Sequence, residues 1–251
     1  MLYPTEKQKE IIELAYKFRF INRHHVQKLL NHKDARRINA WLKELTEYNF
    51  LGRIYSHKLL ENTKPAIYYL SGEGIRFIQK QHKFELKDVK KFYGDKKASQ
   101  KFIDHCIVIT EFFVKMKVYE RISKNTYTFK TKTECYTNEV LNDLKPDLYM
   151  EKTKKRKKDS FFMDIFDPHV PRYALRYRIK QYIEFYEHDW DEEYKFPYVL
   201  LVLPNAQKIR HLRRYTQKQE YDSDIIFQFT TQERLLKEEI EAISWETVSG
   251  D

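Results

Sequence analysis

Glycine and cysteine are both scarce in this chain of 251 residues. Its 5 glycines leave no room for a glycine-rich phosphate-binding loop or a collagen-like repeat. Its two cysteines, Cys106 and Cys135, provide neither a disulfide framework nor a set of metal ligands. No apolar run approaches the ~18 residues of a transmembrane helix, and the N-terminus does not have the pattern of a secretory signal. We therefore expect a cytoplasmic protein that has no contact with a membrane.

Charged residues, in contrast, are plentiful, and their two signs are unevenly distributed. The formal net charge is +10, and residues 1–158 carry 35 Lys and Arg against 19 Asp and Glu. Residues 159–251 carry 12 against 18, so the front of the chain is basic and the rear is acidic. Such a distribution is typical of a protein that meets a polyanion with one side, although surface lysines also serve solubility alone.

The first 82 residues show helix and strand patterns in a defined order. Apolar residues at helical spacing predict three helices, with Thr5, Asn22 and Asp34 as their N-caps. Two strand-like runs follow at 50–55 and 66–70, and a further helix begins near Gly74. Three helices, a β-hairpin and a closing helix are the order of a winged helix-turn-helix domain, which we assign to residues 1–82.

The third helix of this domain is the candidate DNA-reading element. Ile38, Trp41, Leu42 and Leu45 form its buried stripe, so its opposite face could enter a major groove while the hairpin reaches neighbouring phosphates. The candidate DNA contacts are polar or cationic side chains of this helix, the turn before it and the hairpin: Lys33, Arg36, Arg37, Asn39, Lys43, Arg53, His57, Lys58 and Lys64. The alternative is a winged helix that binds protein, in which these residues form a solvated face.

The remainder predicts an α/β domain over residues 101–251, after a basic linker or polar helix at 83–100. A long helix is followed by three strand-like runs, a helix near 173–186 and a buried strand at 197–203. This is the core order of the PD-(D/E)XK nuclease-like fold. The predicted fold class is therefore α+β, with an N-terminal winged helix-turn-helix followed by an α/β domain that has a nuclease-like core.

Two carboxylates of this domain could serve a nuclease. Asp147 opens one strand and Asp164 lies in the next, and such a pair can hold Mg²⁺ for water activation. Phe166 stands where the motif has a lysine, so no basic group is left there to stabilise developing charge. In an active enzyme Asp147 and Asp164 would be catalytic and metal-binding, joined by Lys180 or Glu134. We expect instead a degenerate scaffold that has no catalytic activity and needs no cofactor.

Two further patterns allow more than one interpretation. The run Lys154–Lys158 is either a phosphate-binding loop or an ordinary basic hairpin between strands. A set of aromatic residues at helical spacing could stack nucleic-acid bases, although such a set more often packs in a core. Its members are Tyr173, Tyr177, Tyr182, Phe185 and Tyr186.

Most of the chain resembles the replication-relaxation family of plasmids and conjugative elements of Gram-positive bacteria. The resemblance rests on the winged helix, on His105 near the start of the long helix, on the strand Lys145-Pro146-Asp147 and on Asp164 between apolar residues. It continues in Lys180 and Tyr182 of the next helix, whereas Asp167 lies one residue later than the second acid of the family.

The resemblance implies an accessory role in plasmid replication or conjugative transfer, at an origin and beside a relaxase or replication protein. Double-stranded DNA would be the ligand, and the chain could act as a homodimer. Two alternatives stay open: a dimeric winged-helix transcriptional regulator, and a Mg²⁺-dependent endonuclease.

Overall fold

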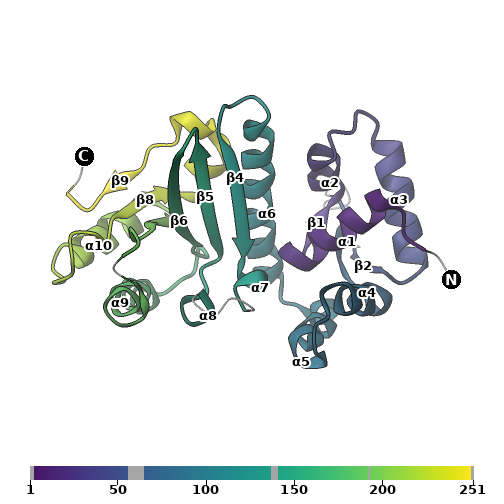
Figure 1. Cartoon of the computed structure of the whole chain (residues 1–251), viewed down its shortest axis with the longest axis horizontal. Helices are drawn as coiled ribbons and strands as arrows, with labels where there is room; N and C mark the ends of the chain where they lie inside the picture. Colours follow the sequence, from purple (N-terminus) through teal and green to yellow (C-terminus); the bar gives the residue numbers. More distant parts are fainter. Residues whose placement is uncertain (1–2, 56–64, 137–140, 192, 250–251) are drawn as a thin grey trace. The chain divides into compact units, whose positions relative to one another are not determined.

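The computed structural model describes residues 3–55, 65–136, 141–191 and 193–249 (Figure 1). The chain divides into two compact units, Met1–Val114 and Lys115–Asp251. Each unit combines helices with its own β-sheet, which confirms the α+β fold class. No helix of the described ranges is long and apolar enough to cross a membrane.

Three helices open the N-terminal unit, and each begins at the residue that the sequence indicates as its cap. These helices are α1 (Glu6–Phe18), α2 (Arg23–Leu29) and α3 (Ala35–Glu47). The side chains of Thr5, Asn22 and Asp34 accept hydrogen bonds from backbone N–H groups of the first turn. Such caps satisfy donors that a helix leaves free, and they fix where each helix starts.

A three-stranded antiparallel sheet completes this part of the unit. Its order is β1-β3-β2, with β1 (Ile21–Asn22), β2 (Leu51–Ile54) and β3 (Ile67–Leu70). Helix α4 (Gly72–His82) follows directly. Gly74 is required in α4, because a Cβ at this position would lie 2.1 Å from the carbonyl oxygen of Phe50. The helix therefore packs against the backbone at the start of the hairpin.

The segment that the sequence indicates as a basic linker, 83–100, is folded into the N-terminal unit. It forms α5 (Leu86–Val89) and the 3₁₀ helix η2 (Lys90–Lys97). Phe92 is buried, and buried Asp95 forms an ion pair with Arg19, the C-cap residue of α1. The division between the units falls instead after Val114, inside the long helix α6 (Gln100–Glu120).

The C-terminal unit contains a six-stranded sheet in the order β4-β5-β6-β7-β8-β9. The strands are β4 (Thr126–Thr131), β5 (Leu148–Lys154), β6 (Lys157–Ile165), β7 (Tyr198–Leu203), β8 (Phe227–Thr231) and β9 (Glu246–Thr247). β4, β5 and β6 are antiparallel, whereas β6, β7 and β8 are parallel. Parallel neighbours need crossover helices, which are α9 (Arg172–Asp189) and α10 (Ala206–Thr216).

The main core of this unit lies between the sheet and these two crossover helices, which contact each other. Phe162 and Leu201 of the sheet pack with Ile179 of α9 and Leu212 of α10. Short helices complete the unit: α7 (Lys132–Cys135), α8 (Leu141–Leu144), α11 (Gln232–Lys237) and η3 (Ile240–Ala242). The packing of α9 turns one of its faces toward β6, where Asp164 lies.

Candidate functional site

Asp147 and Asp164 lie together inside the C-terminal unit, each only 5% exposed. Leu148 of β5 pairs with Met163 of β6, which sets the preceding Asp147 beside Asp164. The backbone N–H of Asp147 donates to Asp164 Oδ1 at 3.2 Å. The backbone N–H of Ile165 donates to Asp147 Oδ2 at 3.0 Å. Pairing of the two strands thus produces a buried pair of carboxylates.

Helix α9 brings a guanidinium to this pair. Arg178 donates from Nε to Asp164 Oδ2 at 2.5 Å and from Nη2 to Oδ1 at 3.2 Å, which is a two-pronged ion pair. Its Nη1 donates to the carbonyl oxygen of Leu144 at 2.8 Å. Lys132 Nζ lies 3.6 Å from Asp147 Oδ1. We call Asp147, Asp164, Arg178 and Tyr182 the carboxylate cluster.

Tyr182 completes the cluster one helical turn after Arg178. Its hydroxyl donates to Asp164 Oδ2 at 2.8 Å, and its ring is fully buried. Burial and then the charge of Asp164 raise the pKa of Tyr182, so the hydroxyl keeps its proton and remains a donor. Burial opposes the charge of Arg178, but Asp164 and Tyr182 outweigh it and raise the pKa of the guanidinium. Arg178 therefore stays positively charged.

The cluster does not fit a magnesium ion. Both oxygens of Asp164 already accept two hydrogen bonds each, and Asp147 faces Ile165 N–H and the Lys132 ammonium. A hard cation needs several free oxygen ligands, and Arg178 puts a positive charge where that cation would have to bind. Within the described ranges, no group of three or more His, Cys, Asp or Glu side chains could hold a metal. We derive no hydrolytic step from this arrangement.

The structure turns Lys180 away from the carboxylates and uses Glu134 as a cap of α7. Lys180 follows Arg178 by two residues, so it lies about 200° around the helix and is exposed on the outer side. Glu134 accepts hydrogen bonds from the N–H and hydroxyl of Thr131 at the start of α7. Arg178 is the residue that sequence reasoning missed. The available signal was an Arg followed four residues later by Tyr182, which places both on one helical face.

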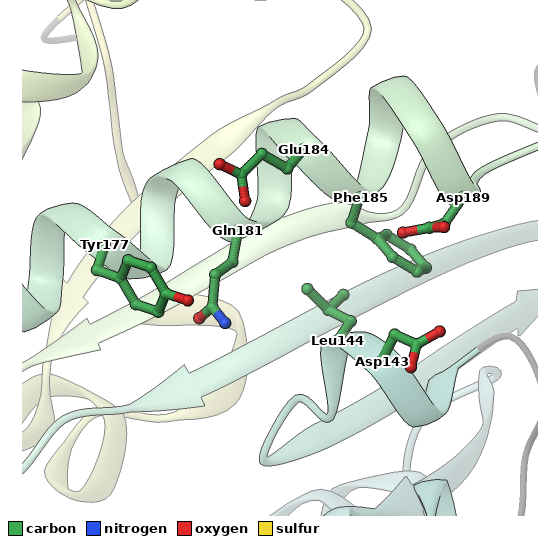
Figure 2. Close-up of a pocket in the computed structure, with 7 residues that line it drawn as sticks. All are labelled: Asp143, Leu144, Tyr177, Gln181, Glu184, Phe185 and Asp189. Atoms are coloured by element: carbon green, nitrogen blue, oxygen red, sulfur yellow. The ribbon is translucent and has the colours of Figure 1, made fainter.

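A small cavity of about 140 Å³ lies beside the cluster, between α8 and α9 (Figure 2). Leu144 and Gln181 line it and also accept hydrogen bonds from Arg178. Its other lining residues include three carboxylates, those of Asp143, Glu184 and Asp189. Tyr177 also lines the cavity, at the opposite end from Asp143 and Asp189, and the negative charge of that acidic end disfavours a polyanion there.

The outer face of α3 is a separate candidate site, in the N-terminal unit. Ile38, Leu42 and Leu45 are fully buried, and the polar candidates point outward from the same helix or the turn before it. All five of these candidates are exposed: Lys33, Arg36, Arg37, Asn39 and Lys43. Trp41, which the sequence also assigns to the buried stripe, is only half-buried, whereas the other three stripe residues and the outward-facing polar residues lie as predicted.

The cations of this face differ in how they are held. The guanidinium of Arg37 lies 5.4 Å from the Trp41 ring, and Arg36 Nε donates to Asp34 at 2.9 Å. Lys43 Nζ lies 3.7 Å from a carboxylate oxygen of Glu47. Arg53 is exposed on β2. The other hairpin candidates, His57, Lys58 and Lys64, lie outside the described residues.

The basic run Lys154–Lys158 forms the exposed end of the β5–β6 hairpin. Lys154 pairs with Lys157 across the strands, and Lys155 and Arg156 form the turn. Lys158 forms an ion pair with Glu151 at 2.8 Å. We call this element the basic hairpin. Its geometry is that of a tight connection that displays cations to solvent.

A comparison with protein families matches the replication-relaxation model to residues 12–199. The match begins within α1 and ends at the start of β7, so it includes both α3 and the carboxylate cluster. No curated protein and no solved structure matches the chain. Because the family model spans well over half of the sequence, the chain belongs to the replication-relaxation family.

Proposed function

We propose that this chain is a DNA-binding accessory protein of plasmid replication or conjugative transfer, and that its N-terminal unit binds duplex DNA as a winged helix. The observation that carries the proposal is the exposed cationic face of α3 opposite its buried stripe. Family membership supports the setting, since replication-relaxation points to plasmid replication or transfer.

The dimensions and charges of α3 suit a major groove. Its 13 residues extend about 20 Å, and a major groove is about 12 Å wide, which admits a helix. Lys33, Arg37 and Arg53 form no ion pair with a described carboxylate, so they are available to phosphates. Arg36 would have to exchange Asp34 for phosphate, at small cost because that pair is exposed.

The C-terminal unit acts in this proposal as a scaffold rather than a nuclease. Arg178 and Tyr182 occupy the oxygens of Asp164 that a metal-dependent enzyme would need. A scaffold of this kind could hold a relaxase, a replication protein or a second copy of the chain. A homodimer would present two α3 helices to a symmetric site.

The test is a titration of a labelled duplex at several salt concentrations with the Arg36→Ala, Arg37→Ala double variant. Affinity should fall, and the slope of log K against log salt should flatten by about 0.9 for each phosphate that the variant no longer neutralises. The Lys7→Ala, Lys9→Ala variant removes the same charge from α1 and is the matched control, which should keep the slope. An unchanged slope in the α3 variant would contradict the proposal.

A further inference from the structure

Helix α9 divides its aromatic residues into two groups. Tyr182 is fully buried and Phe185 is 3% exposed, so these two pack in the core, and half-buried Tyr186 packs against it. Tyr173 and Tyr177 are 75% and 60% exposed and lie one turn apart on the outer side. Residues four apart on a helix are neighbours, so the two exposed rings form one small aromatic surface. Their exposure means that core packing does not account for them.

Exposed cations lie on the same side of α9 as these two rings and on α10, which contacts α9 through Arg176 and His211. Arg172, Arg176 and Lys180 are exposed on the same side of α9, and Arg214 is exposed on α10. Among described residues, none of these four cations forms an ion pair with a carboxylate. Less exposed arginines of the same two helices form such ion pairs, as Arg178 does with Asp164. The outer surface therefore carries positive charge that the fold itself does not neutralise.

Contacts between α9 and α10 hold Arg176 in position. Its Nε donates to His211 Nε2 at 3.3 Å, and its guanidinium lies 5.3 Å from the Tyr215 ring. Burial, followed by the charges of Arg172 and Arg176, lowers the pKa of His211. The imidazole is then uncharged at neutral pH and can accept this hydrogen bond. A side chain that is already ordered loses less entropy when it binds a ligand.

We propose that this surface, comprising Arg172, Tyr173, Arg176, Tyr177, Lys180 and Arg214, binds single-stranded DNA. Exposed bases stack on aromatic rings while cations follow the phosphates, which is how proteins bind single strands without sequence preference. A duplex would leave the rings unused, because its base faces are stacked and only base edges reach the grooves. The acidic residue Glu184 bounds the surface toward the C-terminal half of α9.

This site is distinct from the proposed duplex site, since it lies on a different unit and uses stacking in place of groove contacts. The test is fluorescence anisotropy of a labelled oligothymidine of about 20 nucleotides with the full chain. Replacing both rings, Tyr173→Ser with Tyr177→Ser, should weaken binding at least about 10-fold. The pair Tyr173→Phe and Tyr177→Phe keeps the rings and should bind within about threefold of the parent chain.

Tyr194→Ser is the matched control, because Tyr194 is 65% exposed in the same unit but lies outside this surface. It should leave oligothymidine binding unchanged. A second variant, Arg172→Gln with Lys180→Gln, should flatten the salt slope for oligothymidine by about 1.4. This charge variant keeps the proposal testable if the serine pair does not fold.

Three results would overturn the proposal: no oligothymidine binding by the parent chain, unchanged affinity in the serine pair, or an equal loss of duplex affinity in that pair. A parent chain that binds an acidic peptide but not oligothymidine would be one form of the first result. The Arg36→Ala, Arg37→Ala variant should keep its oligothymidine affinity. Failure at the α3 face and failure at the α9–α10 surface are therefore distinguishable.

Discussion

The carboxylate cluster and the outer face of α3 use charge in opposite ways. In the cluster, Asp164 is buried and has Arg178 and Tyr182 as partners. On α3, Arg37 is exposed beside the Trp41 ring, and no carboxylate of the described residues pairs with it. A buried charge must be matched by the fold, whereas an exposed unmatched charge costs the fold little and stays available to a ligand. On our proposal, the cluster stabilises the structure and the α3 face binds DNA.

Among these predictions, the largest loss of stability is expected when Arg178 is replaced. Arg178→Met should lower the free energy of unfolding by roughly 3–5 kcal/mol, because Asp164 would be left buried with its charge unpaired. Urea denaturation followed by circular dichroism measures this decrease. The double variant Arg178→Met, Asp164→Leu removes both charges and should recover much of it. A decrease below about 1 kcal/mol in the single variant would show that the pair does not stabilise the fold.

A smaller effect is expected from the hydroxyl of Tyr182. Tyr182→Phe removes one hydrogen bond to a charged carboxylate while keeping the buried ring, so unfolding should become easier by roughly 1.5–3 kcal/mol. Urea denaturation again gives the difference. The exposed Tyr194 provides the control, since Tyr194→Phe should change stability by no more than about 0.5 kcal/mol. Equal effects of the two substitutions would contradict the role of Tyr182.

A pH effect tests the same principle in the N-terminal unit, where Lys91 lies near the buried pair of Arg19 and Asp95. Burial and then the charge of Arg19 lower the pKa of Lys91 to about 8, from 10.5 when unperturbed. Between these two pH values the unfolded chain binds more protons than the folded one, so this group makes stability rise with pH. Lys91→Met should flatten that rise relative to the parent chain, as urea titrations across the window would show. A steeper rise in the variant would refute the assignment.

The smallest effect on the fold is expected at the basic hairpin. Lys154→Gln with Lys157→Gln removes two exposed charges, so the melting temperature should stay unchanged. If exposed unmatched charge is available to DNA, the salt slope for a duplex should flatten by up to about 1.8. The same substitutions therefore decide whether this hairpin contacts phosphates or serves only as a connection between β5 and β6. An unchanged slope favours the second interpretation.

Local signals predicted much of the fold. The N-caps Thr5, Asn22 and Asp34 mark the starts of three helices because a cap acts on the residues directly after it. Asp147 and Asp164 could be placed together because neighbouring strands of a hairpin carry them. What escaped prediction depends on distant contacts. Strand β1 has only two residues, too few to show a period, and it exists because Ile21 pairs with Tyr68.

Which face of α9 meets Asp164 also depends on contacts that no local sequence pattern contains. Arg178 and Lys180 are both cationic, and only the packing of Ile179 and Tyr182 against the sheet decides which of them faces Asp164. The boundary between the units was equally hidden. α6 is one continuous helix, and it passes from one unit to the other without a break in its pattern.

The most direct test of the central claim is incubation of the full chain with supercoiled and linear plasmid DNA, with and without Mg²⁺, following retardation and topology together. We expect retardation of both forms, no nicking, and the same result in the presence of a chelator. Nicking that requires Mg²⁺ and disappears in Asp164→Ala would contradict it, because the carboxylate cluster would then be a catalytic centre.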